Sequence, residues 1–312
     1  MAEILSLSPA YKNYIWGGER LKKEYGKQSD DIVAETWELS CNPNGLSIVD
    51  SGTYKGMTLK DALDKMGADC LGTSAAAFDF FPVLIKLIDA KNSLSIQVHP
   101  NDEYALKNEN SYGKTEVWYI VDAVEGAFLY CGFNKDIDKD EFVQRIKDNT
   151  LLEVLNKVYV KKGDVVFIDA GTVHAINAGI LIAEIQQNSD LTYRIYDYNR
   201  LGADGKPRPL HIEKAIAVTD FSKKETVHNN KANDNMLCTC PYFEVYRHNV
   251  NGSANLKSTE KSFHCLLCLE GDAKVVSDNQ SVALNKGKCL FIPADTEYTV
   301  DGNCEFLLTL IP

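Results

Sequence analysis

The chain has 312 residues, of which 45% are hydrophobic and 25% charged, a composition typical of a globular protein. This length is more than one hydrophobic core usually serves, so we expect two compact units. The formal net charge of −11 argues against a nucleic-acid partner or an anionic membrane surface, and no apolar run is long enough to span a membrane.

The expected secondary structure is mostly β. Short apolar runs separated by Gly, Asp and Asn turns are typical of strands. We expect strands at residues 83–89, 94–99, 117–121, 127–131, 165–168, 181–186, 192–197, 265–269, 273–277, 289–292 and 306–311. Helices are expected at residues 58–66, from Asn101 or Asp102 onward, once or twice within 138–156, and at 212–219. In the first helix Thr58 can cap the N-terminus and Gly67 ends it.

Residues 94–99, with the sequence LSIQVH, alternate strictly between apolar and polar side chains. Successive side chains of a strand point to opposite faces, so Ser95, Gln97 and His99 share one face. A buried row of polar groups needs partners, and a metal ion would supply them. The alternative is that His99 is an ordinary hydrogen-bonded structural histidine.

Glu116 lies near the start of the run TEVWYIV (115–121), on the same face of that strand as Trp118. A carboxylate on the inward face of an apolar strand costs free energy unless it is paired or bound to a metal. An ion pair with Lys114 or Arg194 is the alternative to a metal.

The chain contains an internal repeat. Residues 162–176, KGDVVFIDAGTVHAI, align without gaps with residues 286–300, KGKCLFIPADTEYTV. The repeat resembles the second sequence motif of the cupin superfamily, in which glycine and a Pro-x-Gly turn precede a metal-binding histidine. In the first copy the turn at Gly171 reverses the chain, and His174 enters the next strand pointing inward. The second copy has Tyr298 at the histidine position.

The cupin resemblance implies an all-β fold of two jelly-roll barrels with a few short helices. We expect a metal-binding catalytic domain at residues 1–225, with a small helical insertion near residues 138–156. Residues 226–312 are expected to form a cupin-like domain that lacks the metal-ligand histidine.

Four side chains, Gln97, His99, Glu116 and His174, are expected to converge on one divalent metal ion. Each has an ordinary explanation alone, but a Gln-x-His pair, a strand-borne Glu and a motif His in this order favour a metal site. Imidazoles with a carboxylate and an amide oxygen suit zinc, and also iron or manganese. Two histidines and one carboxylate are also the ligand set of non-haem iron oxygenases.

The cysteines indicate a reducing environment. There are nine of them, an odd number, and the start of the chain lacks the basic and apolar regions of a secretory signal. We therefore expect a cytoplasmic protein with reduced thiols. Cys238 with Cys240, and His264-Cys265 with Cys268, lack the spacing of a zinc finger, so we expect buried small apolar side chains there.

Several stretches strongly resemble the type I mannose-6-phosphate isomerase family, in its short bacterial form. They are YKNYIWGGERL (11–21), ETWELS (35–40), FPVLIKLIDAKNSLSIQVHPND (81–102), YGKTEVWYI (112–120), GTVHAI (171–176) and LTYRIYDY (191–198). The resemblance implies that Gln97, His99, Glu116 and His174 bind one Zn²⁺ per chain. It also implies that Arg194 is an active-site arginine and that Lys114 lies at the substrate.

Interconversion of an aldose phosphate and a ketose phosphate moves a proton between C1 and C2 through a cis-enediolate. A metal can polarise the carbonyl, and Arg194, which does not lose its proton, can stabilise the oxyanion. The base is either Glu184 or Lys114, the latter if burial beside Arg194 and the metal favours its neutral amine. Glu184 could instead hold Arg194 in place through a salt bridge.

We expect the phosphate group of the substrate to contact Ser95, Lys114 or another basic side chain. The sequence around Lys86 does not show whether its side chain points inward.

The predicted function is therefore metal-dependent isomerisation of mannose 6-phosphate and fructose 6-phosphate. The alternatives are an iron-dependent cupin oxygenase and a non-catalytic sugar-phosphate sensor. We expect a small phosphosugar as the partner, no nucleic acid or membrane, and a monomer or weak homodimer.

Overall fold

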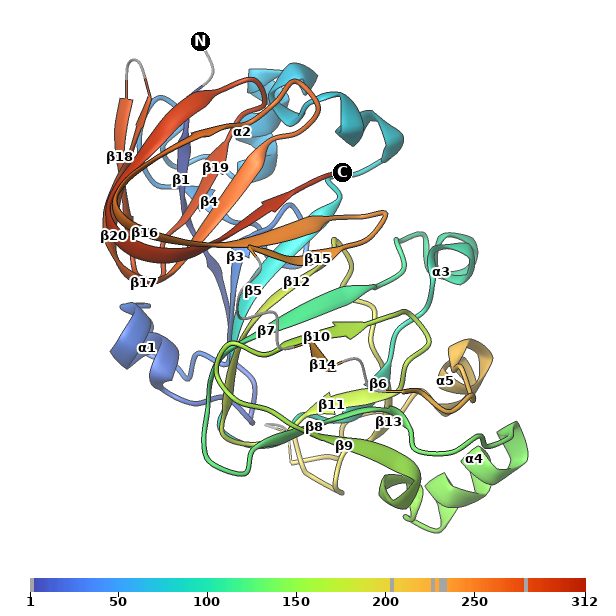
Figure 1. Ribbon diagram of the computed structural model, residues 1–312. Helices are drawn as coiled ribbons and strands as arrows, with labels where there is room; N and C mark the ends of the chain where they lie inside the picture. Colours follow the sequence, from blue (N-terminus) through green and yellow to red (C-terminus); the bar gives the residue numbers. More distant parts are fainter. Residues whose placement is uncertain (1–2, 203–204, 226–227, 230–234, 278–279) are drawn as a thin grey trace.

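The computed structural model describes residues 3–202, 205–225, 228–229, 235–277 and 280–312. Strands dominate it and form three antiparallel sheets (Figure 1). The eight-stranded sheet runs β15 (Met236–Thr239), β16 (Glu244–Lys257), β20 (Glu297–Leu310), β17 (His264–Ser277), β19 (Cys289–Ile292), β1 (Leu5–Ser8) and β4 (Ile48–Val49), with β18 (Gln280–Asn285) paired to β17.

The other two sheets carry the central part of the chain. The seven-stranded sheet runs β14 (His228–Asn229), β10 (Val165–Ile168), β7 (Glu116–Ala123), β12 (Ile180–Gln187), β5 (Val83–Ala90), β3 (Glu35–Leu39) and β2 (Ala10–Lys12). The five-stranded sheet runs β13 (Tyr193–Tyr196), β6 (Ile96–Val98), β11 (His174–Ile176), β8 (Phe128–Phe133) and β9 (Leu155–Tyr159). In the described residues no pairing between edge strands closes any of these sheets.

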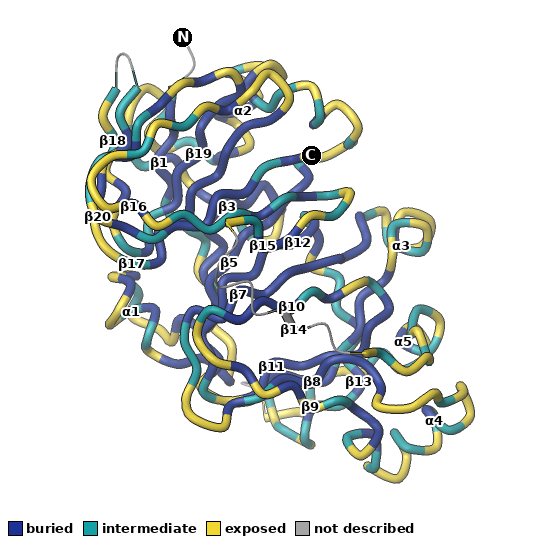
Figure 2. The backbone as a smooth tube through the Cα atoms, in the orientation of Figure 1, coloured by how far each residue is buried: buried dark blue, intermediate teal, exposed yellow. Residues whose placement is uncertain are grey.

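The seven-stranded sheet lies between the other two, and its central strands β5 and β12 are buried on both faces (Figure 2). The two-residue period of β7 shows how the faces differ. Val117 and Tyr119 pack in a core shared with Phe291 of the eight-stranded sheet. Trp118 and Ile120 point the other way, into a core shared with the five-stranded sheet. The polar side chains of this second face are the ones that matter for function.

Five α-helices are present in the described residues: α1 (Arg20–Tyr25), α2 (Leu59–Met66), α3 (Asp102–Glu109), α4 (Lys139–Lys147) and α5 (Ile212–Val218). The short 3₁₀ turns are Ala68–Leu71, Thr73–Ala77 and Leu151–Val154. The expected cap at Thr58 is confirmed, because its Oγ1 accepts from the Asp61 N–H at 3.1 Å. At the predicted start of α3, Asn101 Oδ1 accepts from the Tyr104 N–H at 3.0 Å. None of the described helices has the length and apolar character needed to cross a membrane.

Two secondary-structure predictions need correction. The helix predicted within residues 138–156 is confirmed for α4. It does not continue, because Asn149 takes a left-handed φ of 57° and strand β9 begins at Leu155. The separate strands expected at residues 265–269 and 273–277 are one strand, β17, with a bulge between Cys268 and Glu270. A bulge adds a residue to one strand, so the regular alternation of side chains between the two faces is interrupted there. The sequence therefore predicted two short strands where the structure has one.

The repeat is a structural one. Gly163 and Gly287 have φ values of 89° and 82°, and both precede a strand, β10 in the first copy and β19 in the second. The reversing turn has φ 86° at Gly171, and Asp295 adopts a left-handed φ of 53° at the same place in the second copy. The two copies therefore use the same backbone path with different side chains.

The N-terminal strands join the sheet of the C-terminal region. β1 pairs with β19, with Leu5 opposite Phe291, and β4 pairs with β1. The sheets are thus not divided at residue 225, where the sequence places a domain boundary, because residues 5–8 pair with β19, which follows that boundary, and residues 48–49 pair in turn with residues 5–8.

Candidate metal centre and active site

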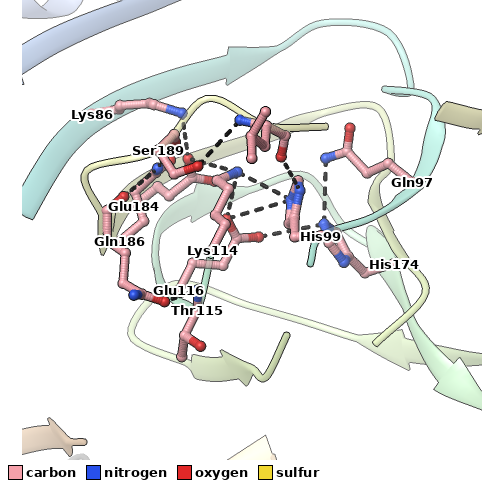
Figure 3. A network of polar contacts seen from close by, with 12 residues as sticks. Lys86, Gln97, His99, Lys114, Thr115, Glu116, His174, Glu184, Gln186 and Ser189 are labelled. Carbon is pink, nitrogen blue, oxygen red and sulfur yellow. Dashed lines mark hydrogen bonds and ion pairs between the residues drawn. The ribbon is translucent and has the colours of Figure 1, made fainter. Parts of the chain in front are cut away.

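Two facing sheets bring the predicted ligands together. Glu116 opens β7 on the inner face of the seven-stranded sheet, whereas His174 opens β11 and His99 follows β6 in the five-stranded sheet. One donor atom from each of the three lies within 4.8 Å of the others. All three side chains are buried. They point toward one another (Figure 3).

Each histidine is held by its Nδ1 atom. Nδ1 of His99 lies 2.7 Å from the Leu191 carbonyl oxygen, and Nδ1 of His174 lies 2.8 Å from that of Thr172. A carbonyl accepts only, so Nδ1–H donates and Nε2 keeps its lone pair. Burial lowers the pKa of His174 to about 4 and that of His99 well below its usual value. Both rings are therefore neutral near pH 7, the form that binds a metal.

Glu116 supplies the negative charge. Its Oε1 lies 3.4 Å from Nε2 of His174, and its Oε2 lies 3.8 Å from Nε2 of His99. Burial and the nearby Glu184 raise its pKa to about 7. Among the described residues Oε1 accepts no hydrogen bond. A buried carboxylate oxygen without a donor, facing two imidazole lone pairs, fits a divalent cation.

Gln97 lies beside this group. It is directly opposite His174 in the pairing of β6 with β11, and its side-chain amide nitrogen is 3.3 Å from Nε2 of His174. A half-turn about the last side-chain bond exchanges the amide nitrogen and oxygen in this place. The position of Gln97 is therefore compatible with the ligand role that the sequence predicts.

Lys114 contacts two of the predicted ligands. Its Nζ lies 2.7 Å from Oε2 of Glu116 and 3.1 Å from Nε2 of His99. The same Nζ is 3.9 Å from Oε1 of Glu184. The ion pair of Lys114 with Glu116 is the one that the sequence offered as the alternative to a metal, and it coexists with the three-donor cluster.

Glu184 is engaged on both oxygens. Oε1 accepts from Nζ of Lys86 at 2.8 Å, and Oε2 accepts from the indole N–H of Trp118 at 2.9 Å. Burial alone would raise the pKa of Glu184, but the charges of Lys86 and Lys114 outweigh it and hold the pKa at about 2. The salt bridge to Arg194 that the sequence offered as an alternative role for Glu184 is not formed among the described residues. Lys86, whose direction the sequence left open, points inward and pairs with Glu184 instead.

Arg194 lies on β13, opposite Gln97 of β6. Its Nη1 donates to the Pro209 carbonyl at 2.9 Å, and its Nε is buried without a hydrogen bond among the described residues. Burial lowers its pKa from the ordinary value. Ser95, which precedes β6, is also buried.

Sequence reasoning missed several nearby groups. Lys86 and Trp118 were not assigned a role, and Arg200 and Arg208 were not considered. Arg208 binds both carboxylate oxygens of Asp197, at 2.7 and 2.6 Å, and Arg200 shares one of them at 2.6 Å. Only the strand register, which places Lys86 and Trp118 on either side of Glu184, would have revealed the first two.

Comparison with known proteins agrees with this geometry. A model described as "Phosphomannose isomerase type I, catalytic domain" matches residues 4–127, and one described as "Mannose-6-phosphate isomerase, cupin domain" matches residues 233–311. The mannose-6-phosphate isomerase ManA of Bacillus subtilis is 38% identical, and the alignment covers 98% of each chain. The chain belongs to the type I mannose-6-phosphate isomerase family. The family resemblance read from the sequence is thereby confirmed.

Other members of the mannose-6-phosphate isomerase family are similar over their whole length. The enzyme of Streptococcus mutans is 37% identical, with 98% of each chain covered. The crystal structure of the Bacillus subtilis mannose 6-phosphate isomerase superposes with a TM-score of 0.88 at 33% identity, and covers 99% of each chain. The fold is thus of the cupin type found in this family.

Proposed function

We propose that this protein interconverts mannose 6-phosphate and fructose 6-phosphate by moving a proton between C1 and C2 through a cis-enediolate. The observation that carries the proposal is the convergence of two neutral imidazoles and a buried carboxylate beside Lys114. It is supported by similarity along the whole chain to proteins named for this activity.

We propose one zinc ion per chain, held by His99, Glu116, His174 and Gln97. Three nitrogen and oxygen donors with an amide oxygen as the fourth suit zinc, and the buried Oε1 of Glu116 has no other partner among the described residues. When bound, a divalent metal supplies Lewis acidity toward the substrate carbonyl and hydroxyl oxygens.

The chain's own residues supply positive charge and position. Lys114, adjacent to the ligands, contacts the reacting carbons and carries the proton. Glu184 is a poor base, because both its oxygens are engaged and its pKa is about 2. We therefore assign it an orienting role toward Lys114. Arg194, two strands from His174 across Gln97, stabilises the developing oxyanion, and Ser95 meets the phosphate end of the substrate.

The test compares matched histidine variants. His99→Gln removes a proposed ligand, whereas His264→Gln changes a buried histidine of the C-terminal region. We expect wild type and His264→Gln to convert mannose 6-phosphate, to lose activity with a chelator and to regain it with zinc. His99→Gln should be inactive and bind no zinc tightly. Full activity of metal-free wild type would contradict the metal role, and a zinc-loaded wild type without turnover would contradict the reaction.

Two histidines and a carboxylate also describe an iron oxygenase site, and an intact fold alone is compatible with a sugar-phosphate sensor. Bound iron with oxygen consumption would favour the first, and tight sugar-phosphate binding without turnover would favour the second. The position of Lys114 against Glu116 and His99 favours the isomerase, because that reaction needs a cation or proton carrier next to the metal donors.

We further propose that the chain comprises a catalytic unit at residues 1–225 and a C-terminal unit at residues 226–312. Each would be a jelly-roll barrel, with β1 of the first unit pairing in the sheet of the second.

We also propose that the protein is a cytoplasmic monomer or weak homodimer. None of the nine cysteines, all of which lie in the described residues, is in a disulfide, which supports a reducing compartment. Light scattering across a concentration series would measure the oligomeric state.

A further inference from the structure

Trp118 stands in a row of site-facing side chains that crosses the seven-stranded sheet. It lies opposite Glu184 of β12, Glu184 lies opposite Lys86 of β5, and Lys86 lies opposite Trp37 of β3. The row thus places a buried ion pair between two indole rings. Trp118 is fully buried, and no role has been assigned to it so far.

The indole of Trp118 makes two directed contacts. Its N–H donates to Oε2 of Glu184 at 2.9 Å. Its ring meets the His174 imidazole edge to face, with centroids 5.4 Å apart and planes at 74°. An apolar side chain would fill the same space, but it would leave a buried carboxylate oxygen without a donor. Trp118 therefore connects a proposed metal ligand with the carboxylate of the Lys86–Glu184 pair.

The orientation of the Glu184 carboxylate matters because Lys114 lies close to it. Nζ of Lys114 contacts Oε2 of Glu116 and Nε2 of His99. The Nε2 lone pair of His99 is one that a metal ion would use, so a bound ion and Lys114 would compete for it. Among the described residues Glu184, at 3.9 Å, is the carboxylate within 4 Å of Nζ of Lys114 that is not itself a proposed metal ligand.

We propose that Trp118 is a positioning residue: its N–H fixes the carboxylate of Glu184 so that Glu184 holds Lys114 in place once the metal ligands are occupied. The same ring also packs against His174. The inference rests on the proposed isomerase function and adds to it a residue that touches neither metal nor substrate. Residues that orient active-site groups in this way typically affect activity by 10- to 100-fold.

The kinetic test uses Trp118→Phe, which keeps an aromatic ring and removes the N–H. Tyr119→Phe is the matched control, because it removes one donor to a glutamate, Glu305, from the opposite face of β7. We expect Trp118→Phe to lower kcat about tenfold, with KM within twofold and one zinc still bound. Tyr119→Phe should leave kcat within twofold of wild type.

A double variant shows whether Trp118 acts through Glu184. In a Glu184→Gln background the carboxylate that Trp118 fixes is absent, so adding Trp118→Phe should change kcat by less than twofold. A tenfold loss in both backgrounds, or a kcat for Trp118→Phe equal to that of wild type, would overturn the proposal. Loss of zinc from Trp118→Phe would also overturn it, since the effect would then belong to His174.

A measurement without turnover separates this inference from the proposed function. The chain has three tryptophans, so ¹⁵N-labelled protein gives three indole N–H signals. Trp16→Phe and Trp37→Phe identify two of them, which leaves Trp118. We expect Glu184→Gln to shift the Trp118 signal and leave that of Trp16 in place, even if mannose 6-phosphate is not turned over. An unmoved Trp118 signal would exclude the hydrogen bond in solution.

Discussion

The two copies of the repeat place corresponding residues in the same sheet register, which allows the metal centre to be compared with its counterpart position by position. In the first copy Ile168 lies opposite Glu116, and in the second the equivalent Ile292 lies opposite His264. His264 therefore stands where Glu116 stands, just as Tyr298 stands where His174 stands.

The second pair of positions follows from the neighbouring strands. His174 lies opposite Gln97, whereas Tyr298 lies opposite Leu256. Leu256 thus takes the place of Gln97, and Ser258, two residues on, takes that of His99. The C-terminal set is one aliphatic residue, one hydroxyl, one histidine and one phenol.

The two regions differ in whether their buried polar groups have hydrogen-bond partners. In the C-terminal region Nδ1 of His264 lies 2.8 Å from the Tyr298 hydroxyl, and Ser258 Oγ donates to the Pro293 carbonyl at 2.6 Å. In the first region Oε1 of Glu116 has no donor among the described residues and faces the lone pair of His174. The same backbone becomes a metal site only where buried groups need a cation.

The largest expected effect comes from moving the C-terminal residue into the first site. His174→Tyr replaces an imidazole by a phenol that can bond to Glu116 as Tyr298 bonds to His264. We expect zinc affinity to fall by at least a hundredfold and turnover to become undetectable, because a neutral donor is lost from the cluster. Metal analysis of the desalted variant checks this, and a full equivalent of zinc would show that His174 is not a ligand.

A smaller effect is expected outside the repeat. Arg194→Ala removes positive charge from the substrate side but makes no contact with His99, Glu116 or His174 among its hydrogen bonds. We expect kcat to fall by roughly 10²- to 10³-fold, as for loss of an oxyanion donor, while one zinc stays bound. Steady-state kinetics and metal content are measured on the same sample. Loss of the metal together with the rate would mean that Arg194 supports the ligands instead.

The smallest effect concerns acid stability. Burial lowers the pKa of His264 to about 4, below the unfolded value near 6.5. The unfolded chain therefore binds a proton that the folded chain does not, so stability is full above pH 6.5 and is lost as the pH falls toward 4. Each such histidine contributes a slope of about 1.4 kcal/mol per pH unit in this window.

His264→Gln removes the group that takes up this proton on unfolding. The dependence of the unfolding free energy on pH between pH 6.5 and 4 should therefore become less steep by about the contribution of one histidine. The comparison is made on metal-free protein by urea unfolding at several pH values. His174, with a pKa of about 4 for the same reason, keeps its share in this variant. An unchanged slope would show that His264 is not buried as a neutral group.

Much of the candidate site could be predicted from the sequence, because those residues belong to local sequence patterns. Alternation along residues 94–99 places Gln97 and His99 on one face, and the repeat motif selects His174. The Lys86–Glu184–Trp118 row was beyond reach, since it depends on which strands are neighbours in the sheet and in what register. The pairing of β1 with β19 was missed for a similar reason: Leu5 and Phe291 are far apart in the chain, and no local signal joins them.

The central claim is that one region of this fold holds a metal ion and the matching region does not. The most direct test is to load metal-free wild type and Tyr298→His with excess zinc, desalt both and count zinc per chain. We predict one ion in each, because Leu256 and Ser258 leave the restored histidine without a complete donor set. Two ions in Tyr298→His, or none in wild type, would contradict the account.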